Sequence, residues 1–252
     1  MKIIALFTPL VLLASPLLVR AQDAFPSADE IVARMGAHDA DRQLAMEGYE
    51  GMRKYILENE GRHKHAEMIV RVNGDPDGTK HFEIVSEDGW KAAHKHVLRK
   101  MLDSEAETSR PGERAKSRLN ADNYNFQLVG VEAVGDRPAY VLELAPKRKE
   151  RYLFRGRIWV DKEDYALVRA EGNPAENPSF WTKSTHFVHN YGKNGPVWFP
   201  VFTQSVTDVR IFGTTCLNIE YFDYMPRASF PDVSFLTARD LFAASEASYG
   251  GR

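Results

Sequence analysis

Three side chains that could bind a metal alternate along one stretch of the chain, at His63, His65 and Glu67. Side chains two residues apart on a β-strand point to the same face, so a strand here would present two imidazoles and a carboxylate together. Zinc and similar ions accept such ligands, and His81 on a neighbouring strand would supply a fourth. A solvated outer face opposite apolar residues such as Met68 explains the same pattern. We favour that alternative, and we predict no metal and no other cofactor.

Basic side chains gather in two places, the segments 91–100 and 147–157. Positive clusters attract phosphate headgroups or acidic partner proteins. The candidate docking residues for such a partner lie in the second cluster, at Arg148, Arg151 and Arg155. The ordinary alternative is that strand and helix exteriors are charged because they face water.

The sequence contains none of the common catalytic motifs. It lacks a Gly-x-Ser-x-Gly elbow, a His-Glu-x-x-His pair, a phosphate-binding loop and a dinucleotide-binding glycine motif. Cys216 is the single cysteine, and it lies in a strand-like segment that favours a small buried side chain over a nucleophile. We therefore predict that the chain is not an enzyme, and we keep a metal-dependent enzyme built on His63, His65 and Glu67 as the least favoured alternative.

The segment 1–21 has the features of a cleaved export signal. Lys2 gives a positive start, Ile3–Val19 is largely apolar, and Ala21 provides a small residue at the cut. The apolar run is short and contains two prolines, which argues against a membrane anchor. Gln22, and not a cysteine, follows the cut, so we expect no lipid-modified N-terminus, and the single cysteine leaves no internal disulfide. We expect a periplasmic protein, exported by a Sec-type signal and not lipid-anchored.

Charge and length restrict the remaining classes of protein. The formal net charge is −2, and it becomes about −4 when Lys2 and Arg20 leave with the signal. This mild charge argues against nucleic acid as a partner. We predict a signal peptide over 1–21, one β domain over 22–228, and a C-terminal segment over 229–252 with a short helix near Phe235–Ala244 and a loose tail.

Alternation of apolar and polar residues predicts about ten antiparallel strands. Tight links such as Gly135–Pro138 join them, and parallel strands would need longer crossovers. The expected strands are Glu50–Asn59, Lys64–Asn73, His81–Ser86, Tyr124–Val134, Ala139–Pro146, Arg151–Val160, Ala166–Glu171, Thr182–Tyr191, Val197–Thr207 and Arg210–Tyr224.

Two helices are expected beside these strands. Ser27 and Glu30 have the spacing of a capping box, and Gly36 is the expected stop, with a polar helix-compatible stretch beyond it. A second helix is expected over Trp90–Glu105, followed by a loop over Ala106–Asp122 with room for a short helix. The fold class is α+β and mainly antiparallel β: an incomplete, half-open barrel of about ten strands covered by two or three helices.

A long sheet twists and curls, and its concave side either packs as core or lines a cavity. Aromatic rings suit both uses, and we leave both open. The expected cavity residues are Tyr124, Phe126, Leu128, Tyr140, Leu142, Leu144, Tyr152, Phe154, Ile158, Val160, Leu217, Ile219 and Tyr221, with Ala166, Val168 and Ile211 also inward. The expected lid residues are Ile31, Met35, Val97 and Met101.

The order of one helix, three strands, a helix and a run of strands resembles the periplasmic lipoprotein-carrier fold of LolA, LolB and RseB. Gly156–Tyr165 is similar to the hydrophobic–Trp–hydrophobic–Asp strand end of outer-membrane lipoprotein-sorting proteins. Val168–Gly172 and Asn218–Tyr221 fit the same pattern, and the resemblance spans most of Ser27–Tyr224. The resemblance implies an incomplete barrel that is covered by helices and holds acyl chains. It does not identify which residues of this chain contact the cargo.

Two hypotheses about function follow from this resemblance. The first is a soluble carrier that shelters the acyl chains of a lipoprotein or lipid, passing them between membrane-bound donor and acceptor proteins. The alternative is an RseB-like sensor that binds lipid or misplaced protein and docks on a membrane-bound regulator.

Overall fold

The computed structural model describes residues 25–44, 46–150, 152–177, 182–195, 197–210 and 213–228. The expected signal segment 1–21 and the expected helix near Phe235–Ala244 lie outside the described residues, so both stay predictions. Among the described residues, no helix is both long and apolar enough to cross a membrane.

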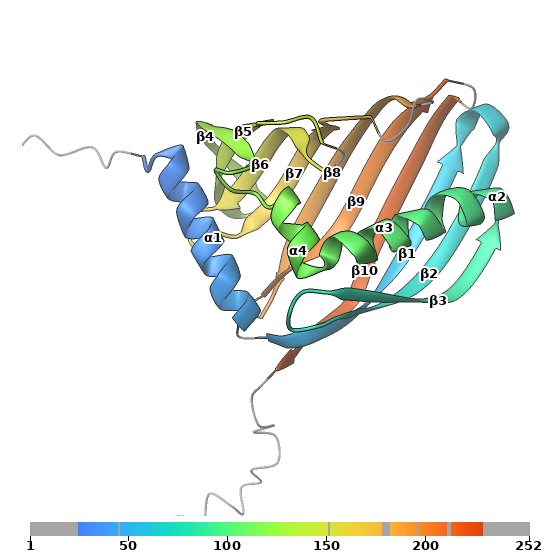
Figure 1. The fold of residues 1–252 in the computed structure, drawn as a ribbon, viewed down its shortest axis with the longest axis horizontal. Coiled ribbons are helices and arrows are strands. Elements are labelled where there is room, and N and C mark those ends of the chain that lie inside the picture. The colour runs from blue at the N-terminus through green and yellow to red at the C-terminus, as the bar shows by residue number, and fades with distance from the viewer. Residues whose placement is uncertain are drawn as a thin grey trace, which may run out of the picture.

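The ten described strands form one sheet in which every pair of neighbours is antiparallel (Figure 1). The strand order is β3-β2-β1-β10-β9-β8-β7-β6-β5-β4, so β3 and β4 are its two edges and the sheet stays open. This confirms the expected fold class. The strands are β1 (Met46–Asn59), β2 (Lys64–Gly74), β3 (Lys80–Gly89), β4 (Tyr124–Val134), β5 (Arg137–Pro146), β6 (Phe154–Asp161), β7 (Leu167–Pro174), β8 (Thr182–Asn194), β9 (Val197–Val209) and β10 (Gly213–Ala228).

The helical segments lie before β1, between β1 and β2, and between β3 and β4. The first, α1 (Ala28–Leu44), begins where expected, because the Glu30 N–H donates to Ser27 Oγ at 3.2 Å. It continues through Gly36, so the expected stop there is wrong and the polar stretch beyond it is helical. The others are η1 (Glu60–Arg62), α2 (Lys91–Ala93), the π-helical turn η2 (His94–Leu98), α3 (Arg99–Ser109), α4 (Pro111–Arg114) and η3 (Ala115–Ser117).

The strand boundaries differ from expectation mainly in length. The prediction for β4 is correct at both ends, whereas β7 and β8 run three residues further than expected, to Pro174 and Asn194. The start of β6 moves from Arg151 to Phe154, because the N–H of Leu153 donates to the carbonyl of Glu150 and closes a turn there.

Register shows which side chains share a face of the sheet, because directly opposite residues in antiparallel strands point the same way. One row crosses nine strands through Met68, Tyr55, Ile219, Thr203, His189, Ala170, Ile158, Leu142 and Leu128. The next row passes through Ala66, Leu57, Leu217, Ser205, Phe187, Gly172, Gly156, Leu144 and Phe126. We call this side of the sheet the inner face.

Figure 1 shows α1 and α3 over different ends of the sheet. A hydrophobic core lies on the inner face beneath each of them. The α1 core joins helix residues to strands β4–β7 and contains Ile31, Val32, Met35, Tyr124, Tyr140, Leu142, Leu144, Leu153, Ile158, Val160 and Ala170. The α3 core joins the inserted helices to β1, β2 and β10 and contains Ala93, Leu98, Leu102, Tyr55, Leu57, Ala66, Met68, Val70, Val72, Leu217 and Ile219. Strands β8 and β9 lie between the two cores, and the start of β9 adds a smaller cluster in which Val197 and Phe199 pack with Tyr224.

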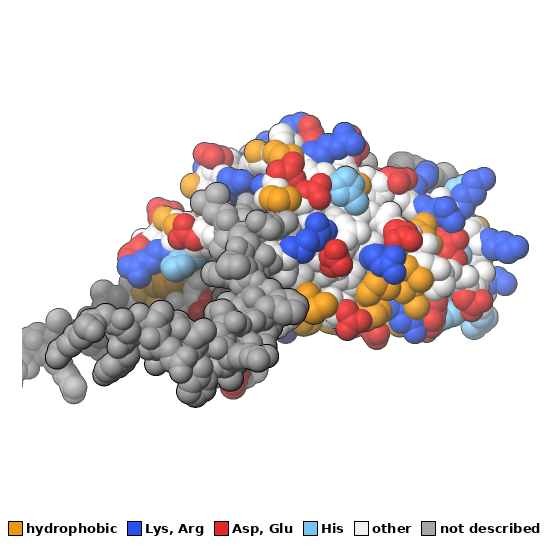
Figure 2. All heavy atoms as spheres, turned by 90° about the horizontal axis from the view of Figure 1, so that it is seen from below, with side chains coloured by type: hydrophobic (Ala, Val, Ile, Leu, Met, Phe, Trp, Pro, Cys, Tyr) orange, Lys and Arg blue, Asp and Glu red, His pale blue; other side chains and the backbone are white. Residues whose placement is uncertain are grey.

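The opposite, outer face has a smaller core of its own around Ala139, Val141, Trp159 and Val168. Val168 is therefore not inward as expected, while Ala166 is buried and Ile211 lies outside the described residues. A view of the surface from below shows acidic and basic side chains mixed with small groups of hydrophobic ones (Figure 2).

Candidate functional site

Most of the expected cavity residues lie on the inner face, as the alternation predicts. Tyr124, Tyr140, Leu142, Leu144, Ile158 and Val160 are buried in the α1 core, with Phe126, Leu128 and Phe154 packed against them. Leu217 and Ile219 belong to the α3 core, with Tyr221 beside them. The members of the α1 core share it with helix side chains, including the expected lid residues Ile31 and Met35.

Three expected site residues lie elsewhere. Tyr152 precedes β6 and is 42 % exposed, with its hydroxyl 3.4 Å from Ser104 Oγ. Val97 and Met101 are 40 % and 37 % exposed, so they are not the side chains that pack on the sheet. The π-helical turn explains this difference, because it separates the buried positions Ala93 and Leu98 by five residues. Sequence periodicity does not reveal such a turn.

On β8 and β9, between the two cores, the side chains of the inner face become mostly polar. In the middle of these two strands the inner-face side chains are Thr185, Phe187, His189, Thr203, Ser205 and Thr207, which we call the central strip. All of them except Thr203 are half-buried, whereas Met68 and Ile158, in the same row on either side, are fully buried. Solvent therefore reaches the inner face between the two helix-covered cores.

Hydrogen bonds tie part of the central strip together. His189 Nδ1 lies 2.7 Å from Thr203 Oγ1, which lies 3.0 Å from the hydroxyl of Tyr221. The hydroxyls of Thr185 and Thr207 lie 3.2 Å apart. Burial lowers the pKa of His189 to about 4, so its imidazole is neutral near pH 7. The strip is thus polar but uncharged.

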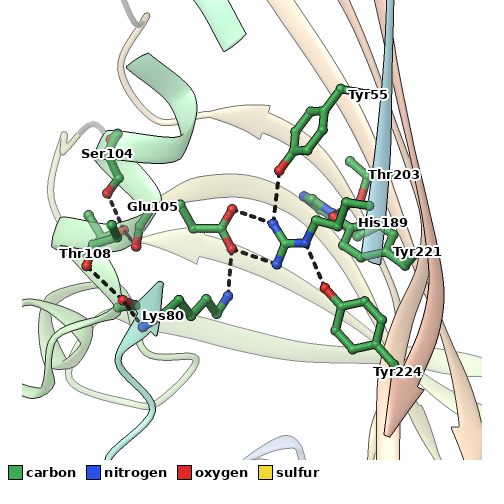
Figure 3. A network of polar contacts seen from close by, with 12 residues as sticks. Tyr55, Lys80, Ser104, Glu105, Thr108, His189, Thr203, Tyr221 and Tyr224 are labelled. Carbon is green, nitrogen blue, oxygen red and sulfur yellow. Dashed lines mark hydrogen bonds and ion pairs between the residues drawn. The ribbon is translucent and has the colours of Figure 1, made fainter. Parts of the chain in front are cut away.

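A second set of polar side chains connects helix α3 to the sheet next to this strip (Figure 3). Arg53 of β1, whose side chain is 3 % exposed, makes two bonds to Glu105: Nη1 to Oε2 at 2.8 Å and Nη2 to Oε1 at 3.1 Å. Arg53 also donates to the hydroxyls of Tyr224 and Tyr55, at 2.8 and 3.1 Å. Lys80 Nζ reaches Glu105 Oε1 at 2.7 Å. We call these five residues the clamp.

The clamp is an electrostatically matched group. Burial alone would raise the pKa of Glu105, but the nearby charges of Lys80 and Arg53 outweigh it and hold that pKa well below its usual range. Burial raises the pKa of Tyr224 to about 12. The carboxylate is therefore ionised and shared between two cations, which links α3 to strands β1 and β3.

Sequence reasoning missed the clamp, although a signal for it exists. Arg53, Tyr55 and Leu57 alternate along β1, and by the period of two they share the inner face. An arginine on an otherwise apolar face predicts a buried partner, because an unpaired buried charge is costly. The identity of that partner, on α3, depends on tertiary packing that the sequence does not show.

The expected docking residues do not form one free surface. Arg148 is held within the molecule: Nη1 donates to Asn123 Oδ1 at 2.8 Å and Nη2 to the Lys116 carbonyl at 2.7 Å. Arg151 lies outside the described residues. Arg155 is exposed on the outer face of β6.

The four-ligand metal site suggested by the histidines is not assembled. His65 and Glu67 are close, with Nε2 and Oε1 3.2 Å apart, but Glu67 also pairs with Lys54. His63 occupies a left-handed turn, and His81 lies opposite Asn73 near the far end of β2. Within the described part of the chain, no group of three or more His, Cys, Asp or Glu side chains could hold a metal ion.

Comparison with known proteins supports the resemblance inferred from the sequence. Residues 93–177, from the inserted helix into the segment after β7, match the family model of the MucB/RseB N-terminal domain. This match confirms a resemblance to LolA/RseB-like proteins. No curated protein matches the chain.

Several solved structures are similar over most of the chain at low sequence identity. A LolA superfamily protein from Nitrosomonas europaea is 12% identical, with 85% of this chain and 99% of that one covered and a TM-score of 0.43. A DUF1329 family protein from Desulfovibrio piger is 13% identical, with 84% and 98% covered and a TM-score of 0.43. The MucA/MucB complex of Pseudomonas aeruginosa is 12% identical, with 77% and 100% covered and a TM-score of 0.25.

Proposed function

We propose that this chain is an exported, non-catalytic binding protein that shelters the acyl chains of a lipoprotein or lipid on the inner face of its sheet. The observation that carries the proposal is the change in burial along that face. The side chains of the central strip other than Thr203 stay half-buried, while those on both sides are buried beneath separate helices. The predicted signal segment supports export, and the family match supports a carrier or sensor class.

The energetics explain why an acylated molecule needs such a protein. Each methylene kept from water contributes roughly 0.8 kcal/mol, so a sixteen-carbon chain corresponds to on the order of 10 kcal/mol. A free acylated molecule does not readily leave a membrane against such a cost. A carrier must replace most of that burial and still release its cargo, which favours movable covers over a sealed core.

The two covers are attached to the sheet in different ways. Helix α1 packs Ile31, Val32 and Met35 on the sheet and donates one hydrogen bond from Arg34 to the Tyr165 hydroxyl at 3.0 Å. The inserted helices pack Leu98 of η2 and Leu102 of α3 and add the buried ion pairs of the clamp. Because the two covers pack in different cores, we propose that each can move without the other. Under this proposal, acyl chains enter over β8 and β9, and displacement of a cover adds part of its core to the pocket.

A titration with a fluorescent acyl probe tests this proposal. Phe187→Asp places a charge on the half-buried inner face, and Val206→Asp places the same charge on the outer face of neighbouring β9, where Val206 is 41 % exposed. We expect the mature wild-type chain and the Val206→Asp variant to bind the probe, and Phe187→Asp to bind it at least ten-fold more weakly. Equal binding by both variants, or no binding by the wild type, would contradict the proposal.

A sensor that docks on a membrane-bound regulator is the second candidate. It is favoured by the particular family model matched, that of the MucB/RseB N-terminal domain. Its docking surface would be the exposed basic side chains of β6, Arg155 and Arg157. Cross-linking to isolated inner membranes tests it: the double variant Arg155→Glu/Arg157→Glu should lose a specific cross-link and keep probe binding. A cross-link pattern identical to that of the wild type would rule out this surface.

A further inference from the structure

The central strip contains unpaired hydrogen-bonding atoms in a place where a purely apolar pocket would have none. Among the described residues, neither the Ser205 hydroxyl nor Nε2 of His189 has a hydrogen-bond partner, and both residues are half-buried. Ser205 lies opposite Phe187, and His189 opposite Thr203, in adjacent rows of the inner face. These two polar atoms therefore belong to one small part of the inner face, which would form the floor beneath a bound ligand.

Hydrocarbon laid over this floor would leave both atoms without water and without a partner. A buried polar group that loses its hydrogen bonds is destabilising by an amount equivalent to about a ten-fold change in an equilibrium constant. A ligand with a hydrogen-bonding group at this position avoids that loss. The strip therefore selects for a polar group within a largely apolar ligand.

The charge of the strip indicates what kind of polar group fits. His189 is neutral near pH 7. Arg53 and Lys80, the described cations whose charges act on His189, are already bound to Glu105. A buried anion would have to compete with Glu105 for these two cations, whereas a carbonyl, ester, amide or hydroxyl needs none.

The surroundings indicate where the apolar part of the ligand lies. Phe187 packs edge-on against Phe154 of β6, with ring centroids 5.1 Å apart. In the row of Ser205 and Phe187, the next two positions are Gly172 and Gly156, which add no side chain to the floor. Under the proposed function, an acyl chain that begins at the strip would run over these glycines toward the α1 core.

We propose that the central strip binds the neutral polar linkage of an acyl ester or acyl amide, with Ser205 and His189 as the contacting residues and the acyl chain directed toward the α1 core. This inference rests on the proposed function and defines its ligand class more closely. It favours glycerol-ester and amide-linked acyl groups over plain hydrocarbons and over free carboxylates.

Competition against a fluorescent acyl probe tests the inference with three ligands of one chain length: monolauroylglycerol, dodecane and laurate. The main variant is Ser205→Ala, which breaks no hydrogen bond within the described residues. His189→Leu removes the second proposed contact, and the double variant removes both. Val206→Ala on the outer face is the matched control. We expect Ser205→Ala to weaken monolauroylglycerol binding about ten-fold and to leave dodecane binding unchanged or tighter.

The outcomes separate this inference from the proposed function. Equal effects of Ser205→Ala on monolauroylglycerol and dodecane, or no effect on either, would overturn the inference and leave the carrier function intact. Tighter binding of laurate than of monolauroylglycerol would indicate an anion site and would also overturn it. If the wild type binds none of the three ligands, both the inference and the proposed function fail.

Discussion

Arg53 on strand β1 and Glu105 on helix α3 form a bidentate ion pair across 52 positions of sequence, with N–O distances of 2.8 and 3.1 Å. The pair joins a helical cover to the sheet at the edge of the half-exposed strip (Figure 3). The Arg53 side chain is only 3 % exposed, so water cannot compensate its charge and the Glu105 carboxylate must do so.

Removal of the Glu105 carboxylate should therefore loosen α3. Glu105→Ala leaves the charges of Arg53 and Lys80 close together and uncompensated. Losing one partner of a buried pair costs several kcal/mol, and because Glu105 is a third exposed we expect a loss of about 2 kcal/mol in the free energy of unfolding. Urea denaturation measures this loss.

The control is Glu113→Ala, which removes the partner of Lys116 in a pair that is exposed on both sides. It should change the free energy of unfolding by less than about 0.5 kcal/mol. Hydrogen exchange should quicken in Arg99–Ser109 of the Glu105→Ala variant and stay unchanged in α1. Equal losses of stability in the two variants would show that the clamp has no special role.

Stability should also depend on the titration of His189. Its pKa falls from 6.5 to about 4 on folding, so the unfolded chain binds more protons between these values. The contribution of His189 is fully present above pH 6.5 and is lost as the pH falls toward 4. Glu105, with its lowered pKa, adds a loss that begins only below its unfolded value of 4.5.

His189→Gln should flatten the decline in stability between pH 6.5 and about 5, before the carboxylates contribute. The matched control is His186→Gln, because His186 is exposed on the same strand. Urea midpoints measured across this range for both variants check the prediction. If the slope of the urea midpoint against pH changes equally in the two variants, the pH dependence does not come from His189.

Two glycines allow β6 and β7 to approach closely. A Cβ on Gly156 would lie 2.0 Å from the carbonyl oxygen of Glu171, and one on Gly172 would lie 2.2 Å from that of Arg155. Gly156→Ala should therefore destabilise the protein by about 1–3 kcal/mol, as overpacking does. Gly130→Ala is the control, since nothing lies within 4 Å of its Cβ, and the two Tm values should differ clearly.

The basic residues near β6 should separate into structural and exposed groups. Arg148→Glu should lower stability, because its guanidinium bonds to Asn123 and to the Lys116 carbonyl. Arg155→Glu should leave the Tm nearly unchanged, because Arg155 is exposed. A loss of Tm in Arg155→Glu as large as that in Arg148→Glu would contradict this division.

Much of the fold could be predicted from the sequence, because period-two alternation is local. It placed ten strands, assigned Tyr124, Leu142 and Ile158 to one face, and indicated an open antiparallel sheet. Helix α1 was predicted at its start from the Ser27 cap, but not at its end, because an exposed glycine does not by itself stop a helix.

The rest depends on tertiary relationships that no local pattern contains. The five-residue spacing at the π-helical turn moved Val97 and Met101 off the packed side of the inserted helix. The clamp joins residues distant in sequence, and the central strip appears only when register places Thr203 and His189 opposite one another. Strand register and helix packing, rather than local sequence propensity, determine these features.

The central claim is that the inner face shelters acyl chains, and native mass spectrometry of the mature chain tests it most directly. The protein would be purified from the periplasm without detergent and its bound material extracted with solvent. We predict a protein mass increased by a ligand that extracts as an acylated molecule. A mass equal to that of the bare chain, with no uptake of added monolauroylglycerol, would contradict the account.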